Sequence, residues 1–266
     1  MKIIKYIFIV VVCFCVFSCS RKEFSFVPEG YNLVWSDEFD YDGEPDKEKW
    51  AYSIGGNGWG NGEIQKYTDN RDNSFVKDGV LSIIARNSNG MWTSARLKTQ
   101  YKESWTYGYI EIRAKLPVGV GTWPALWLMP EFDKYGGWPR SGEIDIMEHV
   151  GFDQDIIHTT IHSSDFNHKK NTQIGHSAKV SNVSSKYHVY AVNWTEDYIE
   201  WFVDGKSFFR ADKTADTVEA WPFNHNFYLI MNIAIGGSWG GQEGIDKNLK
   251  QAVMNVDYVR VYQKQG

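Results

Sequence analysis

Alternating apolar and polar residues predict β-strands along most of this chain. In "YGYIEIRAKLP", residues 107–117, every second side chain is apolar, and Glu111, Arg113 and Lys115 would face the other side. "FYLIMNIAIGG", residues 227–237, is an unbroken apolar run, as expected of a strand that is buried on both faces. No amphipathic helix longer than two turns is evident in the pattern. The chain is therefore predicted to be all-β.

Two further segments support this prediction. Residues 187–210, "YHVYAVNWTEDYIEWFVDGKSFFR", contain three strand-like runs, separated by turn signals at 195–197 and 204–205. Residues 252–263, "AVMNVDYVRVYQ", predict another strand near the end of the chain. Many short strands joined by Gly- and Asn-rich loops indicate a β-sandwich, and residues 31–266 are expected to form one domain.

The first twenty residues follow a different pattern. "MKIIKYIFIVVVCFCVFSCS" has Lys2 and Lys5, then an apolar run that is short for a membrane span, then small residues. Residues 1–18 are predicted to be a secretory signal peptide. Cys19 follows "VFS", which resembles the lipobox of bacterial lipoproteins, so we expect an exported, membrane-anchored lipoprotein with a lipidated Cys19 and a tether over residues 19–30. The alternatives are a plain signal peptide and an uncleaved anchor.

Composition narrows the partners that such a domain can have. All three cysteines lie within the first 19 residues, so the mature domain would have no internal disulfide and would depend on its core. The chain carries a net charge of −5, and loss of the two lysines of the signal segment, which has no acid, makes it −7. Without a basic cluster, nucleic acid is not an expected partner and a polyanionic substrate is disfavoured. The 12 tryptophans offer flat apolar faces that suit either sugar rings or a sandwich core.

The stretch "GEIDIMEHVG", residues 142–151, carries three carboxylates. Strand alternation places Glu143 and Asp145 on one face, but it would put Glu148, three residues later, on the other. A β-bulge at one of the two residues between Asp145 and Glu148 would return Glu148 to the same face. On a concave sheet the two glutamates could then approach the separation of about 5–5.5 Å that a retaining glycosidase needs. The alternatives are solvated acids on an open sheet face, where their repulsion is unrelieved, and a calcium site, for which the loop geometry is missing.

This stretch resembles the E-x-D-x-x-E signature of glycoside hydrolase family 16, in the bulged form of its laminarinase-like members rather than the unbulged E-x-D-x-E form. Five further segments match the laminarinase-like pattern in the expected order: "WSDEFD" at 35–40, "GGNGWGNGEIQKYT" at 55–68, "GTWPALWLMP" at 121–130, "NIAIGGSWGG" at 232–241 and "NVDYVRVYQ" at 255–263. The resemblance implies a concanavalin-like β-jelly roll, a sandwich of two curved antiparallel sheets with a substrate groove across the concave face. It also implies a retaining endo-β-glucanase acting on glucans that contain β-1,3 bonds, either laminarin-type or mixed-linkage β-1,3/1,4.

The resemblance carries roles over by position. Glu143 matches the nucleophile, Glu148 the general acid/base, and Asp145 the assisting acid between them. The residues that match substrate-binding positions are Asn57, Arg96, Trp123, Trp138, His162 and Trp239. His168 lies in the same loop as His162, where Phe166 replaces a tyrosine that related sequences often have. The alternative is core packing for each tryptophan and an ordinary loop contact for each histidine.

The resemblance implies no catalytic cofactor, but it implies a structural calcium ion on the convex side. The matching ligands are the backbone carbonyls of Glu38 and Gly79 and the side chain of Asp257, which could alternatively be an ordinary strand-end residue. We expect a monomer. Alternative functions are a transglycosylase, a hydrolase of another polysaccharide such as agar or carrageenan, and a non-catalytic carbohydrate-binding protein on the same fold. The intact row of acids disfavours a non-catalytic protein, and the lack of a basic cluster disfavours a sulfated substrate.

Overall fold

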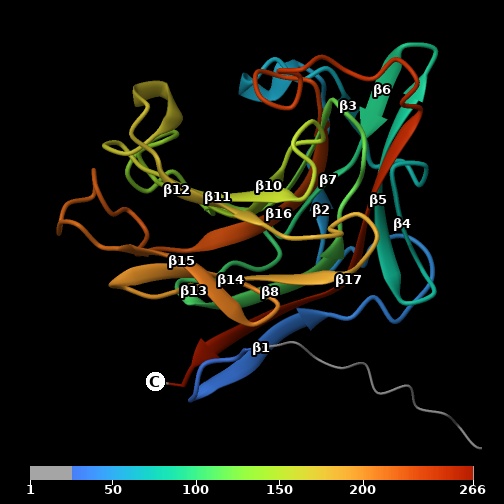
Figure 1. Ribbon diagram of the computed structural model, residues 1–266. Coiled ribbons are helices and arrows are strands. Elements are labelled where there is room, and N and C mark those ends of the chain that lie inside the picture. Colours follow the sequence, from blue (N-terminus) through green and yellow to red (C-terminus); the bar gives the residue numbers. More distant parts are fainter. Residues whose placement is uncertain (1–25, 266) are drawn as a thin grey trace, which may run out of the picture.

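Two curved β-sheets pack face to face in the computed structural model, which describes residues 26–265 (Figure 1). The larger sheet contains β1 (Tyr31–Asp37), β3 (Lys66–Tyr67), β4 (Ser74–Lys77), β5 (Val80–Ser88), β6 (Met91–Ser94), β8 (Gly108–Lys115), β13 (His188–Trp194), β14 (Tyr198–Val203), β15 (Lys206–Asp212) and β17 (Gln251–Lys264). The smaller sheet contains β2 (Ala51–Tyr52), β7 (Arg96–Lys98), β9 (Thr122–Pro130), β10 (Glu143–His149), β11 (Ile156–His162), β12 (Ile174–Lys179) and β16 (Phe227–Ile235). The predicted all-β sandwich is confirmed.

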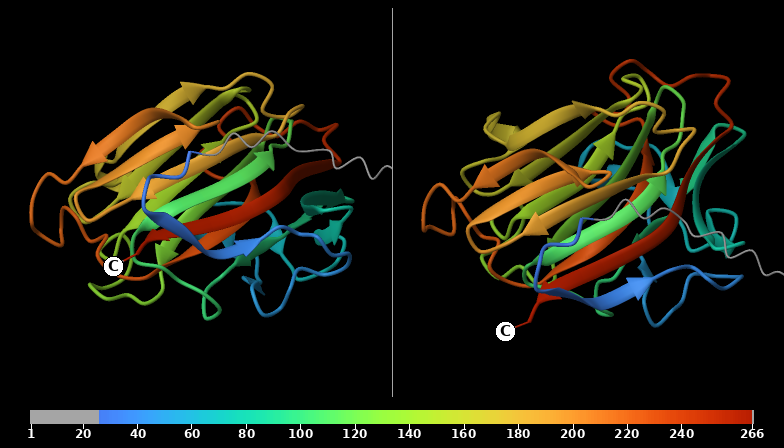
Figure 2. Two further views of the ribbon diagram at one scale, coloured as in Figure 1. Left: turned by 90° about the horizontal axis from the view of Figure 1, so that it is seen from below. Right: turned by 60° about the horizontal axis from the view of Figure 1, so that its bottom comes forward.

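The strand order shows which segments lie side by side. The larger sheet runs β15-β14-β13-β8-β17-β5-β6-β3, with β1 paired to β17 and β4 to β5. The smaller sheet runs β12-β11-β10-β9-β16-β7-β2. All pairings are antiparallel except that of β3 with β6. The green, red and orange strands of the larger sheet lie side by side when the molecule is seen from below (Figure 2).

The segments predicted from alternation form strands. The 107–117 segment contains β8, and 187–210 contains β13, β14 and most of β15, with turns at the expected places. All nine residues of β16 are buried, which fits its unbroken apolar sequence. Glu111, on the polar side of β8, is also buried, because its carboxylate lies 3.6 Å from the guanidinium of Arg260 on the neighbouring β17.

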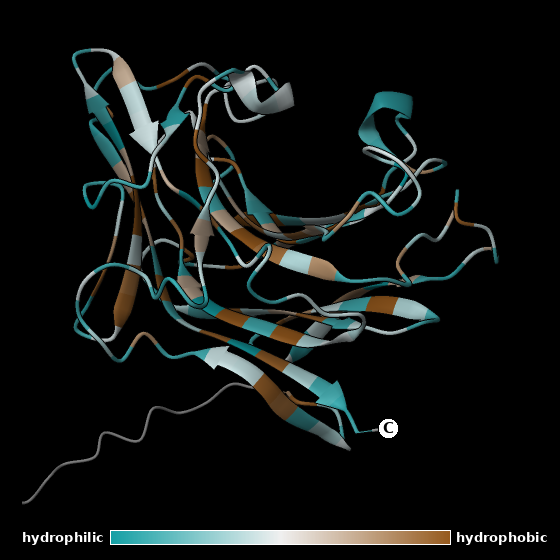
Figure 3. Ribbon diagram, turned by 180° about the vertical axis from the view of Figure 1, so that it is seen from behind, coloured by the Kyte–Doolittle hydropathy of each residue, from teal (hydrophilic) through white to brown (hydrophobic). Residues whose placement is uncertain are grey.

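The core fills the space between the sheets and includes large aromatic side chains from both of them, among them Trp194, Trp201 and Phe227. Hydrophobic segments lie mainly on the strands, whereas the outer loops are mostly hydrophilic (Figure 3). The only helices among the described residues are two 3-10 turns, η1 (Gly58–Gly60) and η2 (His168–Lys170). Neither is a helix long and apolar enough to cross a bilayer.

The loops that carry η1 and η2 rise from opposite ends of the strands of the smaller sheet (Figure 1). A cavity of about 570 Å³ opens on this face of the sheet. It is lined by side chains from β9 to β12 and from loops at both strand ends, with Glu143, Glu148, His158, His162 and Trp239 among them. The fold thus places the row of acids on the floor of a groove.

Candidate active site

Glu143, Asp145 and Glu148 lie on β10, near the middle of the smaller sheet. Against β11, the register of β10 shifts by one residue between Asp145 and Glu148. Against β9, the shift lies between Asp145 and Met147, which makes Ile146 the extra residue. The predicted bulge is confirmed, and both glutamates line the same cavity.

Polar contacts hold the bulged strand in place. The backbone carbonyl of Asp145 accepts hydrogen bonds from the Thr159 hydroxyl at 2.7 Å and from the Trp201 indole at 2.9 Å. A bulge leaves some backbone groups without a hydrogen bond to the neighbouring strand, and a buried carbonyl without a partner destabilises the fold. Because Trp201 belongs to β14 of the larger sheet, the core of the sandwich directly supports the strand that carries the acids.

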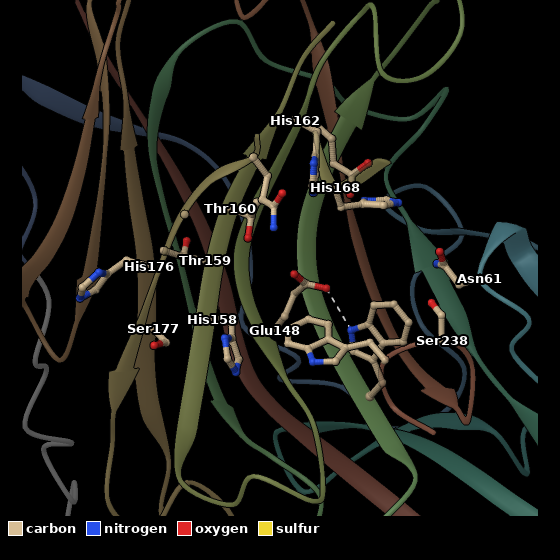
Figure 4. A pocket seen from close by; sticks show the side chains of 15 residues that line it. Asn61, Glu148, His158, Thr159, Thr160, His162, His168, His176, Ser177 and Ser238 are labelled. Carbon is tan, nitrogen blue, oxygen red and sulfur yellow. Dashed lines mark hydrogen bonds between the residues drawn. The ribbon is translucent and has the colours of Figure 1, made fainter. Parts of the chain in front are cut away.

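Each glutamate accepts a hydrogen bond from a different tryptophan. Trp138, in the loop between β9 and β10, donates its indole N–H to Glu143. Trp123, near the start of β9, donates to Glu148 at 2.9 Å, the bond drawn in Figure 4. The two tryptophans therefore lie beside the acids, and each fixes the orientation of one carboxylate.

Burial raises the pKa of all three carboxyl groups. The pKa of Glu143 rises to about 8 through burial and the neighbouring Asp145, partly offset by His162 and the Trp138 hydrogen bond. The pKa of Glu148 rises to about 7 through burial, against the lowering effect of the Trp123 bond. Asp145 is 2 % exposed, and its pKa lies well above its usual value because of burial and then Glu148. The row therefore titrates as a group and keeps protons near neutral pH, so ionised and protonated carboxyls can coexist in it.

His162 lies directly opposite Glu143 on β11. Its Nε2 atom is 3.4 Å from the Asp145 carboxylate, and its ring centroid lies 5.8 Å from that of Trp138 and 5.2 Å from that of His168 on η2. The structure thus brings His162 to the acids, as predicted. Ligand atoms of Glu143, Asp145 and His162 lie within 4.8 Å of one another, so these three residues could also hold a metal ion.

Trp239 lines the opposite wall of the cavity, as expected for a groove-edge aromatic. Its ring packs edge-on against Trp123 with 5.4 Å between centroids. It also packs against His158, at 4.8 Å. His158 pairs with Glu148 across the β10–β11 ladder, and the two side chains lie close together in Figure 4.

Arg96 and Asn57 lie on the other side of the acids. The Arg96 guanidinium, on β7, is held between two indoles, 4.9 Å from the Trp59 ring and 4.7 Å from the Trp127 ring. Asn57 is exposed just before η1. Among the described residues, the cavity lining includes Asn61 from this loop but not Asn57.

Trp127 is a groove residue that the sequence analysis did not select. Its indole donates to Asn232 at 2.7 Å, Asn232 donates to Tyr67 at 3.0 Å, and Tyr67 donates to Glu63 at 3.4 Å. Gln65 donates to the same Glu63 oxygen at 2.6 Å. This buried polar chain fixes Trp127 and the floor beside β10.

Spacing could have found two of the missed residues. Trp127 lies four residues after Trp123, and His158 lies four residues before His162. An even separation places both members of each pair on the same face of a strand.

The three positions predicted to bind calcium converge on β17. β5 pairs with β17 as far as Val256, and β1 pairs with it from Val259 onward, so Asp257 lies between these two pairings. Gly79 is in the turn that leads into β5, and Glu38 directly follows β1. The register therefore brings Glu38 and Gly79 next to Asp257.

The donor atoms at this place fit calcium in kind. Arg260 binds both carboxylate oxygens of Glu38 at 2.9 Å, which leaves the Glu38 carbonyl as its available donor. The buried Asp257 carboxylate accepts from Arg113 at 2.6 Å. Carbonyl and carboxylate oxygens are the ligands that calcium takes, although Arg113 competes for Asp257. Calcium binding stays a prediction, and so does lipidation, because Cys19 lies outside the described residues.

Comparison with known proteins decides the family. Residues 61–260 match the model of glycosyl hydrolases family 16. This chain belongs to that family. It is 52 % identical over 244 residues to a beta-glucanase of Rhodothermus marinus, covering 87 % of this chain and 85 % of that protein. It is 39 % identical over 267 residues to glucan endo-1,3-beta-glucosidase A1 of Niallia circulans, covering 89 % of this chain but 38 % of that longer protein.

Solved structures of family 16 members have the same fold. The laminarinase of Rhodothermus marinus matches with a TM-score of 0.85 and 50 % identity, over 89 % of this chain and 98 % of that one. SCLam, a non-specific endo-beta-1,3(4)-glucanase crystallised with an oligosaccharide, matches with a TM-score of 0.85 and 41 % identity, over 90 % and 97 % of the chains. The predicted jelly roll is confirmed.

Proposed function

We propose that this protein is a retaining endo-β-glucanase that hydrolyses glucans containing β-1,3 bonds, of laminarin type or mixed linkage. The observation that carries this proposal is the row of three carboxylates on the bulged β10, with an indole donor on each glutamate. The names of the family 16 relatives support it, because they include laminarinases and endo-1,3(4)-glucanases. No cofactor is needed for this chemistry.

The roles follow from the two steps of a retaining reaction. Glu143 attacks the anomeric carbon while Glu148 protonates the departing oxygen, which leaves a glycosyl ester on Glu143. Glu148 then deprotonates a water molecule that attacks the same carbon and releases Glu143. Trp138 donates to Glu143 and so favours its ionised form. Burial raises the pKa of Asp145 well above its usual value, so Asp145 can share a proton with Glu143 between turnovers.

A substrate panel with product analysis tests this function. Purified protein is incubated with laminarin, barley-type mixed glucan, lichenan, agarose and carrageenan, and the released oligosaccharides are identified. We expect oligosaccharides from the β-1,3-containing glucans, and proton NMR should show the β-anomer first. Release from agarose or carrageenan alone would favour the alternative polysaccharides, and no release from any of them would favour a binding protein. An initial α-anomer would contradict the retaining mechanism.

The calcium site is a separate proposal. Its support is the strand register, which places Glu38 and Gly79 next to the buried Asp257. An ion that binds only the folded state stabilises it by mass action. Calcium should therefore raise the melting temperature of chelator-treated protein, and Asp257→Asn should remove that increase. A melting curve that is the same with chelator and with calcium would contradict the site.

Anchoring through Cys19 is also proposed, from the lipobox-like residues before it. The protein would then be an exported lipoprotein held in a membrane by its N-terminal lipid, with a monomeric catalytic domain. Cys19→Ala should move the protein from the membrane fraction to the soluble fraction. A Cys19→Ala protein that still sediments with membranes would contradict lipidation.

A further inference from the structure

Two exposed aromatic rings lie side by side at the edge of the smaller sheet. Tyr101 is 72 % exposed and Phe132 is 68 % exposed. Their centroids are 6.5 Å apart, although the residues come from different loops, one after β7 and one after β9. Large apolar rings exposed together on one surface mark a binding site more often than single exposed ones do.

Polar groups with unused hydrogen-bonding capacity lie next to these rings. Glu131 is 8 % exposed, and one of its carboxylate oxygens accepts from the backbone N–H of Tyr101 at 3.0 Å. Its other oxygen is buried and has no hydrogen-bond partner among the described residues. The Lys98 ammonium lies 5.7 Å from the Tyr101 ring and donates to Gln100 at 2.7 Å. The Glu131 carboxylate therefore fixes the loop that carries Tyr101, and the Lys98 ammonium has further N–H donors for a ligand.

These residues continue the floor of the groove. Lys98 and Arg96 are two positions apart on β7 and therefore share a face. Gln100, two residues after Lys98, donates to the Glu131 carbonyl at 3.4 Å, which joins the end of β7 to the end of β9. β7 lies three strands from β10, or about 14 Å across the sheet. Tyr101 is thus on the Arg96 side, whereas Phe132 follows β9, the neighbour of β10, and lies four residues past Leu128, the partner of Ile144, or about 13 Å along that strand.

We propose that Lys98, Tyr101, Glu131 and Phe132 form a distal platform that binds a β-glucan chain away from the cleavage position. This inference rests on the proposed glucanase function. The faces of Tyr101 and Phe132 would pack against sugar rings, and the Lys98 ammonium beside Tyr101 would donate to a sugar hydroxyl. Only a chain that extends past the cleaved sugar can reach the platform.

Chain length provides the test. KM and kcat are measured for long laminarin and for a β-1,3-linked trisaccharide with Tyr101→Ala, Phe132→Ala and the double variant. We expect KM for the long chain to rise about fivefold for each ring removed, with kcat unchanged and with the trisaccharide unaffected. Tyr101→Phe keeps the ring and should keep the wild-type KM. Leu33→Ala, at an exposed apolar residue of the larger sheet, is the matched control and should change nothing.

The outcomes separate this inference from the function on which it depends. If the wild type cleaves laminarin and the double variant has the same KM, the platform proposal is wrong and the glucanase proposal stands. Equal changes for the long chain and the trisaccharide would also overturn it, because the rings would then act on the cleavage site. Absence of cleavage of any glucan by the wild type would overturn the glucanase itself.

Discussion

The two halves of the groove floor, on either side of β10, are built differently. Towards β9, β16 and β7, Trp127 and Arg96 stack on each other, and a buried chain of hydrogen bonds supports them. Towards β11, Nε2 of His158 and Nδ1 of His162 are buried without a hydrogen-bond partner in the described part of the chain. Nε of Arg96 in the first half is likewise buried without a partner among the described residues, so both halves need a ligand or water, but only the first is also held by a buried chain of hydrogen bonds. Binding strength should therefore depend mainly on the tryptophan half, and departure of the leaving sugar mainly on the histidine half.

The largest expected effects come from the acids at the boundary of the two halves. Glu143→Ala should reduce hydrolysis by about 10⁴-fold or more, because no glycosyl ester can form. Glu148→Ala should reduce cleavage of natural glucans by about 10²–10⁴-fold, because their leaving oxygen needs a proton. On an aryl glycoside with a good leaving group, Glu148→Ala should keep its first step, and azide should restore turnover as a β-glycosyl azide.

Azide separates the two roles. The product is identified by mass spectrometry and NMR, with Glu143→Ala as the control that should not respond. Rescue of Glu143→Ala to a β-glycosyl azide, or no rescue of Glu148→Ala, would reverse the assignment of the two glutamates.

The pH dependence of the rate should follow the acids rather than the histidines. Hydrolysis needs Glu143 ionised and Glu148 protonated. Their raised pKa values, about 8 and about 7, belong to one coupled row, so the form with a single proton on the two glutamates is most populated between pH 7 and 8. Cleavage of laminarin should fall by up to tenfold for each pH unit below this range, where both are protonated, and above it, where Glu148 has lost its proton. Burial lowers the pKa of His158, so this histidine is already neutral there. His158→Gln should leave the basic limb in place, and a limb that moves in this variant would contradict the attribution to Glu148.

Substitutions in each half should affect different kinetic constants. Trp127→Ala removes the stacking face beside Arg96 and should raise KM for β-1,3-glucan about tenfold. His158→Gln should change KM less than kcat, since His158 lies opposite the acid/base. Initial rates over a range of laminarin concentrations give both constants. Equal KM changes in the two variants would remove the distinction between the halves.

The smallest expected effect is on stability and compares two buried acids. The pKa of Glu143 is raised in the fold to about 8, so its stabilising contribution is complete below about pH 4.3 and is lost as the pH rises towards 8. Glu143→Gln should therefore raise the melting temperature by a few degrees at pH 9 and less at pH 5. Burial also raises the pKa of Glu63, but its carboxylate accepts hydrogen bonds from Gln65 and Asn61, so Glu63→Gln should lower the melting temperature at both pH values. Scanning calorimetry at the two pH values checks both, and a pH-independent effect of Glu143→Gln would contradict the raised pKa.

Much of the fold could be predicted because the local residue pattern identifies most of the longer strands. Alternation located β8, the runs and turns of β13 to β15, and the fully buried β16. The spacing of three acids was enough to predict the bulge in β10. The two-residue strands β2 and β3 have no such pattern, because they exist only through pairing with β7 and β6. Their assignment needs the sheet order, which local sequence does not contain.

The same limit applies to the site. The acids and the tryptophans beside them could be placed from one strand and one motif. The chain from Glu63 to Asn232 could not, because it joins residues far apart in the sequence through Tyr67. The contact between Tyr101 and Phe132 likewise depends on two loops that meet only when β7 and β9 are assembled around β16.

Because β10 contains one extra residue, deleting a residue at this point and inserting one should have different effects on the position of Glu148. Asp145 pairs with Thr160, and Glu148 with His158, so the bulge absorbs one residue. Deleting Ile146 would restore plain alternation and leave Glu148 where it is. Inserting one residue would also restore the parity of the strand, but it would carry the acid two positions further, opposite Ile156, about 6.6 Å farther from Glu143. Activity that survives the deletion but not the insertion, with both variants folded, would show that this catalytic strand can be shortened by one residue but not lengthened.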